Sequence, residues 1–156
     1  MSLDRFIQAQ DSGAYAQALD ELRAGAKRSH WIWFVFPQLA GLGSSPMAEL
    51  YGLQGVEEAA AYLRHPVLRQ RLLDAMSAVS ASAKASADKR ATSLRLLMGS
   101  QIDALKLVSS MTLFAEIAKR VNDVDVAAAA DAILESARQQ GYSACAFTLD
   151  RCRANL

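Results

Sequence analysis

The sequence predicts an all-α fold, a compact single-domain bundle of about six to eight helices. The chain has 156 residues, the usual size of one domain. Alanine is the commonest residue, whereas there are only 3 prolines and 8 glycines, a balance that favours helices over a turn-rich sheet. No internal repeat and no Pro-rich or Gly-rich linker divides the chain. We therefore expect residues 1–156 to form one helical domain.

The first half of the chain contains several helix signals. Apolar residues recur at three-and-four spacing within residues 2–25, which predicts a pair of short helices. Ser45-Pro46 and His65-Pro66 each place a capping residue before a proline in the first helical turn. Between them, two acids after Gly55 predict the start of a helix that ends near Leu63.

The second half is expected to hold longer helices. One begins at Pro66 and fades into residues 80–91, a low-complexity stretch that we interpret as a solvated loop or a frayed helix. Ser100, followed three residues later by an acid, matches a capping pattern and predicts a helix that reaches about Arg120. Apolar spacing predicts a further helix over 126–141, whereas the residues after it have too weak a period to assign.

Charge and hydropathy exclude several classes of protein. The 17 Lys and Arg residues against 16 Asp and Glu give a net charge of +1, so we do not expect the concentrated basic face of a nucleic-acid binder. No apolar run approaches the length of a membrane span, and the first residues lack the pattern of a secretory signal. We therefore expect a cytoplasmic protein without a membrane or nucleic-acid partner.

The two cysteines give no sign of a disulfide or a metal site. Cys145 and Cys152 are too far apart to form a disulfide on one helix, and their spacing is not the CxxC pattern of zinc sites. We expect two free thiols, no bound metal and no cofactor.

The densest functional signal lies in residues 27–46. This segment holds both tryptophans and a Gly-x-Gly-Ser-Ser-Pro turn that leads into a helix. Aromatic rings supply rigid walls, Lys27 supplies charge, and amides at a helix start attract anions. The same pattern is also typical of a core in which aromatics pack inside, glycines permit a tight turn and Ser45 caps the helix.

His30 is the candidate for proton transfer in this segment. Histidine is the residue type whose ordinary pKa lies near neutral pH, which makes it suited to proton transfer. A lone histidine is more often structural, however, and for His65 at a helix start we favour the structural role.

The second signal is a set of polar residues in an apolar helix. Asp103, Lys106 and Ser110 share one face, and Ser109 with Thr112 forms a second pair of hydroxyls. In one interpretation these groups line a polar pocket for phosphate, carboxylate or ribose. In the other, helices pack closely here and each hydroxyl donates a hydrogen bond to the carbonyl four residues earlier.

Both segments also carry a family resemblance. The matching residues are Phe6, Ala9-Gln10, Tyr15, Ala18-Leu19, Glu21-Leu22, Lys27, His30 to Gln38, Gly41 to Gly43, Tyr51, Glu58-Ala59, Tyr62-Leu63, His65-Pro66, Arg71-Leu72, Asp103, Lys106-Leu107 and Ser109 to Phe114. On these residues the sequence resembles the bacterial family catalogued as domain of unknown function 1810, some members of which carry the label calpastatin. The resemblance covers about residues 3–115, and the tail after 120 diverges. It implies a compact, mostly helical domain and brings no established activity.

Two functional hypotheses follow. In the first, the 27–46 segment and the 103–114 helix enclose a pocket for a small anionic or nucleotide-like metabolite, and whether a reaction follows is left open. His30 would transfer protons, and the expected ligand contacts are Lys27, Trp33, Gln38, Gly41, Gly43, Ser45, Asp103, Lys106, Ser109, Ser110 and Thr112. In the second, the aromatic block is a non-enzymatic interaction surface for a protein partner or a second copy of the chain.

Overall fold

The structure, a computed structural model, describes residues 2–87 and 93–154 and is all-α over these ranges, which confirms the predicted fold class. Its elements in chain order are α1 (Asp4–Ala9), a π-helical turn η1 (Gln10–Ala14), α2 (Tyr15–Ala24), α3 (Ile32–Val35), α4 (Pro46–Tyr51), α5 (Val56–Arg64), α6 (Pro66–Ala87), α7 (Leu94–Leu97), α8 (Gln101–Arg120), α9 (Val124–Gln139) and α10 (Ala146–Ala154). Outside the helices, an isolated parallel bridge joins Leu39 to Leu53.

Local sequence signals explain where two important helices begin. The Ser45 hydroxyl accepts a hydrogen bond from the Ala48 amide at 3.1 Å at the start of α4. The Ser100 hydroxyl accepts one from the Asp103 amide at 3.1 Å at the start of α8. Both side chains satisfy amides that the first helical turn leaves without a partner. The predicted caps are confirmed, and α8 ends at Arg120 as expected.

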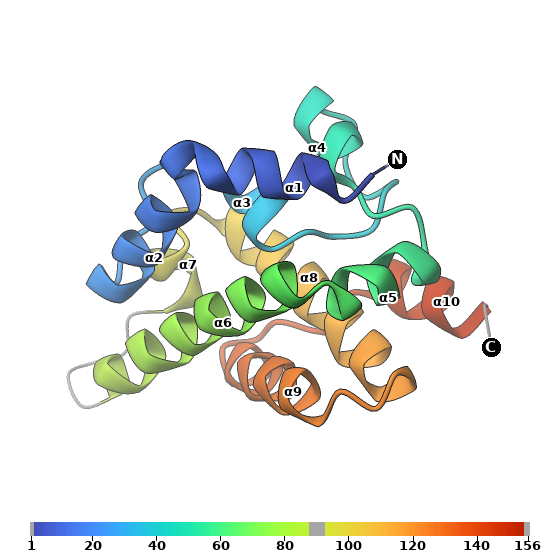
Figure 1. The fold of residues 1–156 in the computed structure, drawn as a ribbon. Helices are drawn as coiled ribbons and strands as arrows, with labels where there is room; N and C mark the ends of the chain where they lie inside the picture. The colour runs from blue at the N-terminus through green and yellow to red at the C-terminus, as the bar shows by residue number, and fades with distance from the viewer. Residues whose placement is uncertain (1, 88–92, 155–156) are drawn as a thin grey trace.

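Helix α8 lies at the centre of the molecule. It packs against α3, α5, α7, α9 and α10, and Figure 1 shows it passing behind α6 with α9 below it. The residues predicted for its core face, Leu107, Met111, Phe114 and Ala118, are all buried. This central position also brings the polar residues of α8 next to other parts of the chain.

Two segments differ from the expectation. Helix α6 continues to Ala87, where we expected a loop or a frayed end from residue 80, and residues 88–92 lie outside the described ranges. Alanine favours helix strongly, and Val79 anchors this part of α6 in the core. The unassigned tail contains α10, whose buried positions are Thr148 and Cys152. Because neither is a large apolar side chain, a search for apolar periodicity misses this helix.

The aromatic block forms the short helix α3 and contributes mainly to the core. Trp31, Phe34 and Phe36 are buried, and only part of Trp33 reaches the surface. The rings of Trp31 and Phe36 lie 6.2 Å apart, centroid to centroid. The core interpretation therefore holds for these three rings. Among the described tryptophan and phenylalanine rings of this block, Trp33 alone offers surface to a partner, and the interaction hypothesis stays a prediction.

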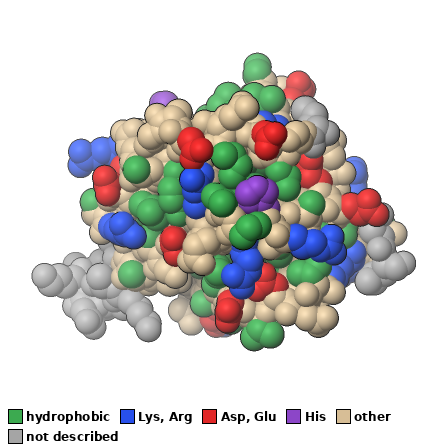
Figure 2. Space-filling view, viewed as in Figure 1, with side chains coloured by type: hydrophobic (Ala, Val, Ile, Leu, Met, Phe, Trp, Pro, Cys, Tyr) green, Lys and Arg blue, Asp and Glu red, His purple; other side chains and the backbone are tan. Residues whose placement is uncertain are grey.

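The molecular surface is mixed in character. On the face shown in Figure 2, acidic and basic side chains are interspersed, with apolar side chains between them. This distribution agrees with the near-neutral charge of the sequence. None of the helices in the described ranges has the length and apolar character needed to cross a membrane.

Candidate functional site

Two contacts join the 27–46 segment to α8. The Lys27 ammonium lies 2.8 Å from the Asp103 carboxylate. About one turn further along α8, the Lys106 ammonium lies 4.8 Å from the centre of the Trp33 ring, a distance typical of a cation–π contact. The predicted proximity of the two segments is confirmed.

A cavity of about 390 Å³ opens at this junction. Its lining comes from the 38–43 stretch, from α8 and from the connection between α9 and α10. The lining residues are Gln38, Leu42, Gly43, Ile102, Leu105, Lys106, Val108, Ser109, Ser143 and Cys145. Among them, Gln38, Gly43, Lys106 and Ser109 belong to the predicted set of ligand contacts. The volume is that of a small-molecule site.

Of the described residues that line this cavity, Lys106 is the one that carries a formal charge. Its side chain is 23% exposed, and its ammonium lies 3.9 Å from the Asp103 carboxylate. Asp103 is closer to Lys27, so it compensates the charge of Lys106 only in part. Nowhere in the described residues do three or more His, Cys, Asp or Glu side chains gather as a metal site. A negatively charged group on a ligand in this cavity would therefore interact with the Lys106 ammonium.

Lys27 and Asp103 form an internal ion pair and do not line the cavity. The Lys27 side chain is only 4% exposed. Its ammonium also donates a hydrogen bond to the Ser29 carbonyl and lies 4.8 Å from the centre of the Trp31 ring. With these partners in place, Lys27 holds the start of the aromatic segment against α8.

The hydroxyls of α8 divide between the cavity and the interior. Ser109 lines the cavity, whereas Ser110 and Thr112 are buried. Thr112 donates a hydrogen bond of 2.8 Å to the Val108 carbonyl, which is the structural role that we considered for these hydroxyls. Among the described residues, none offers a hydrogen-bond partner to the buried Ser110 hydroxyl.

Five predicted residues of the 27–46 segment lie outside the cavity lining, namely Lys27, His30, Trp33, Gly41 and Ser45. Ser45 caps α4, and Gly41 has a φ of 99° and lies so close to Phe147 that an added Cβ would be 3.1 Å from that ring. His30 is exposed and does not line the cavity. Its role in proton transfer stays a prediction without geometric support at this cavity.

Glu21 organises the start of the aromatic segment, although the sequence did not single it out. Its carboxylate accepts hydrogen bonds from the amides of Arg28 and Ser29 at 2.7 and 2.9 Å and from Trp31 Nε1 at 3.0 Å. The Ser29 hydroxyl donates a fourth, at 2.6 Å. Burial raises the pKa of Glu21, but these hydrogen bonds outweigh burial and lower the pKa to about 2. A carboxylate on the apolar face of α2 is the sequence signal that would have identified it.

Cys145 is a lining residue that lies in the unassigned tail. It directly precedes α10, and its amide donates a hydrogen bond of 3.1 Å to Thr112 Oγ1. Its thiol accepts one of 3.2 Å from Thr148 Oγ1. Burial raises the pKa of this thiol, but hydrogen bonds from Ser109, Thr148 and the amide of Phe147 outweigh burial, so the pKa is lowered overall. No local motif in the sequence predicts this environment.

Alkylation is expected to distinguish the two cysteines. Cys145 is partly exposed and has a lowered thiol pKa, whereas Cys152 is buried and burial raises its thiol pKa. Iodoacetamide near neutral pH should therefore modify Cys145 first. The reaction is quenched at timed intervals, the protein is digested, and mass spectrometry measures how much of each cysteine peptide is alkylated. The fast phase should disappear in a Cys145→Ser variant. Faster labelling of Cys152 would contradict this assignment.

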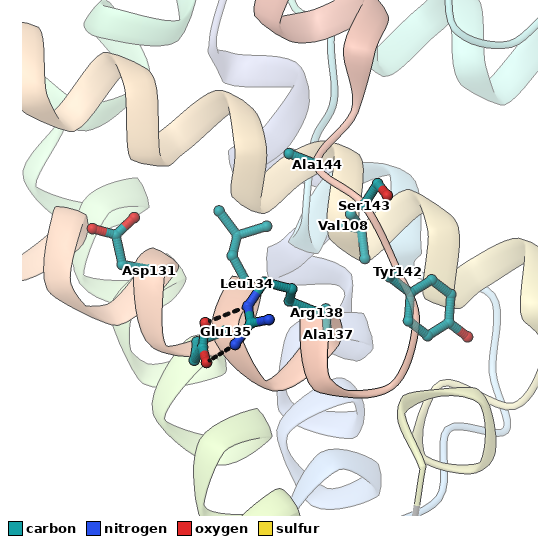
Figure 3. Close-up of a pocket in the computed structure, with 9 residues that line it drawn as sticks. All are labelled: Val108, Asp131, Leu134, Glu135, Ala137, Arg138, Tyr142, Ser143 and Ala144. Atoms are coloured by element: carbon teal, nitrogen blue, oxygen red, sulfur yellow. Dashed lines mark hydrogen bonds and ion pairs between the residues drawn. The ribbon is translucent and has the colours of Figure 1, made fainter.

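A larger cavity of about 640 Å³ borders the first, since Val108 and Ser143 line both. Figure 3 shows Arg138 turned toward Glu135 on α9, and their two hydrogen bonds measure 2.6 and 2.9 Å. Asp131 also lines this cavity and pairs with Lys119 at 3.5 Å. With two carboxylates and one guanidinium, the lining is net negative and does not suit an anion.

Comparison with known proteins gives the family of the chain. A family model described as protein of unknown function DUF1810 matches residues 1–140. The chain belongs to this family. It is also similar to the crystal structure of the conserved hypothetical protein Rv1873 from Mycobacterium tuberculosis, with 39% sequence identity and a TM-score of 0.75 over 95% of this chain and 94% of that chain. The comparison with curated proteins found no match.

The DUF1810 match includes both segments that meet at the cavity. It extends past residue 115, where the resemblance seen in the sequence ended, and stops before Ser143 and Cys145. The likeness to Rv1873 spans nearly the whole chain, so it supports the DUF1810 fold as a whole. Neither the description of the family nor that of Rv1873 states an activity. A function for the cavity therefore has to be argued from its geometry.

Proposed function

We propose that this DUF1810 protein binds a small anionic ligand in the cavity between residues 38–43 and α8. The observation that carries the proposal is the position of Lys106. Its ammonium belongs to a cavity whose described lining residues include no acid, and its carboxylate neighbour Asp103 is engaged more closely by Lys27. A partly exposed, partly compensated cation in a concave site attracts anions.

The surroundings of Lys106 favour binding further. The Trp33 ring, 4.8 Å from the ammonium, restricts the positions that this flexible side chain adopts. A side chain that is already held in place loses less conformational entropy when a ligand arrives. Gln38 adds an amide to the same lining, and an amide N–H₂ can donate to a carboxylate or phosphate oxygen.

The proposal concerns binding and includes no reaction. His30, the candidate proton carrier, lies outside the lining. The lining holds the Cys145 thiol and the Ser109 and Ser143 hydroxyls as nucleophilic groups, but none of its described residues is a His, Asp or Glu that would accept their protons.

A thermal-shift screen tests the proposal. The panel contains nucleotides, ADP-ribose, sugar phosphates and simple carboxylates. A ligand at 100 times its Kd adds about 2.7 kcal/mol to the free energy of unfolding, which corresponds to a rise in Tm of about 5–10 °C for a chain of this size. Lys106→Met should reduce the rise to about half or less, because a tenfold weaker Kd leaves the same ligand at only about 10 times Kd.

The matched control is Lys119→Met, because Lys119 is exposed on the same helix and pairs with Asp131 away from this cavity. This variant should respond to the ligand as the wild type does. A flat response of the wild type to every anion would contradict the proposal, as would an unchanged response of Lys106→Met.

A further inference from the structure

We infer that the ligand is a monoanion with an apolar body, such as a small aliphatic or aromatic carboxylate, and not a nucleotide or a sugar phosphate. This inference rests on the proposed function and names the ligand class that the same cavity accepts. It follows from the charge, the apolar lining and the volume of the cavity.

The charge of the lining matches a single negative charge. Among its residues, all of which lie in the described part of the chain, Lys106 alone is charged. Lys27 cannot supply a second positive charge, because its buried ammonium is bound to Asp103 and to the Ser29 carbonyl. The Asp103 carboxylate, 3.9 Å from the Lys106 ammonium, would repel any excess negative charge on the ligand. A diphosphate would leave charge without a partner in a partly desolvated site.

The lining also offers apolar surface that the fold does not cover. Ile102 and Leu105 lie three residues apart on α8 and are 66% and 49% exposed. They do not belong to the core face of α8, and Leu42 and Val108 continue the apolar lining. Covering such side chains removes apolar surface from water, so a hydrocarbon or aromatic body gains binding energy here. A ribose or a sugar would bring hydroxyls to these side chains, which offer them no hydrogen bonds.

The volume of the cavity agrees with a small organic molecule. At about 390 Å³ it lies near the lower end of small-molecule sites, which reach about 1,000 Å³. One end of a carboxylate ligand would meet Lys106 and the amide of Gln38, while its body would lie against Ile102, Leu105 and Leu42.

Four probes separate the ligand classes. The first two are 4-phenylbutyrate and its neutral amide, which share a body and differ in charge. Inorganic phosphate and ADP carry more charge without a comparable apolar body. Binding is measured by isothermal titration at constant ionic strength, and quenching of tryptophan emission supplies a second readout because Trp33 contacts Lys106. We expect the Kd of 4-phenylbutyrate to be about tenfold lower, or lower still, than the Kd of each of the other three probes.

Two variants assign this preference to the cavity. Replacing both Ile102 and Leu105 by Ser should weaken 4-phenylbutyrate binding about tenfold, because the apolar contact is lost. Lys106→Met should bring the carboxylate and the amide to similar affinities. Val124→Ser is the control for surface substitution, since Val124 is 75% exposed and lies outside the lining. It should leave all affinities unchanged.

The outcomes distinguish this inference from the proposed function. Tighter binding of ADP or phosphate, lost in Lys106→Met, would overturn the apolar monoanion and leave anion binding in place. Equal affinities of the wild type for 4-phenylbutyrate and its amide would overturn the inference, because the negative charge of the ligand would then add nothing to binding. Absence of binding by all four probes, with the thermal screen also flat, would overturn both.

Discussion

Replacing Lys27 by Met is expected to lower the free energy of unfolding by about 3 kcal/mol. Methionine keeps much of the aliphatic stem but removes the ammonium that lies 2.8 Å from Asp103 and donates to the Ser29 carbonyl. Both acceptors then lose their donor in a place that water reaches poorly. The Lys106 ammonium, 3.9 Å from Asp103, still compensates part of the charge of that carboxylate. The expected loss of stability therefore lies near the lower end of the range for buried ion pairs that lose one partner.

A double-mutant cycle isolates this ion pair. Urea denaturation of Lys27→Met, Asp103→Leu and the double variant gives the three free energies of unfolding. Because the double variant leaves neither member of the buried Lys27–Asp103 pair without its partner, it should lose about 2 kcal/mol less than the sum of the single variants. Strictly additive losses would show that the pair does not join the aromatic segment to α8.

The control for this cycle is Lys119→Met on the same helix. Lys119 and Asp131 are 55% and 52% exposed, and their charges lie 3.5 Å apart. Exposed pairs contribute little to stability, so this variant should change the free energy of unfolding by less than about 0.5 kcal/mol.

Replacing Glu21 by Ala is expected to cost about 3–4 kcal/mol at neutral pH. The substitution leaves the amides of Arg28 and Ser29 and the indole N–H of Trp31 without their acceptor. Glu21→Gln should cost less, about 2 kcal/mol, because its amide oxygen can accept the same hydrogen bonds without the negative charge. Chemical denaturation of both variants and of the wild type measures these losses.

The contribution of Glu21 should also depend on pH. The pKa of Glu21 is about 2 in the folded protein and 4.5 in the reference state, so the unfolded chain binds the proton more tightly. The stabilisation is therefore complete above about pH 5 and is lost as the pH falls through 4.5 toward 2. The shift corresponds to about 3 kcal/mol in total.

The variant Glu21→Gln cannot titrate at this position, so its deficit relative to the wild type should shrink over the same pH window. Asp20→Asn is the matched control, because Asp20 is an exposed neighbour on α2. It should change stability little at any pH. A deficit of Glu21→Gln that stays constant from neutral pH to pH 3 would contradict the pKa assignment.

Much of the fold could be predicted from local residues. Ser45 and Ser100 cap their helices as expected, and the core face of α8 follows the spacing of Leu107, Met111 and Phe114. The segment from residue 80 and helix α10 were harder to predict. In α10 the buried residues are Thr148 and Cys152, and their burial depends on packing against distant helices.

The candidate site was predictable as a meeting of two segments but not in its details. Gln38, Gly43, Lys106 and Ser109 line the cavity, whereas Ser110 turns inward. A helix periodicity places Ser109 and Ser110 on adjacent faces, but it cannot say which face another segment covers. Cys145 reaches the cavity only because the chain returns across α8 before α10.

The sequence by itself determined the helical class and the starts of the main helices, because caps and apolar spacing act between residues that are close in the chain. Only the tertiary structure decided which charged groups are buried and paired and which remain partly exposed. Lys27 and Lys106 are equivalent cations in the sequence, yet folding buries one against Asp103 and leaves the other partly exposed at a cavity. The solvation of a charged group depends on which atoms from distant segments surround it, and short-range sequence patterns do not predict those atoms.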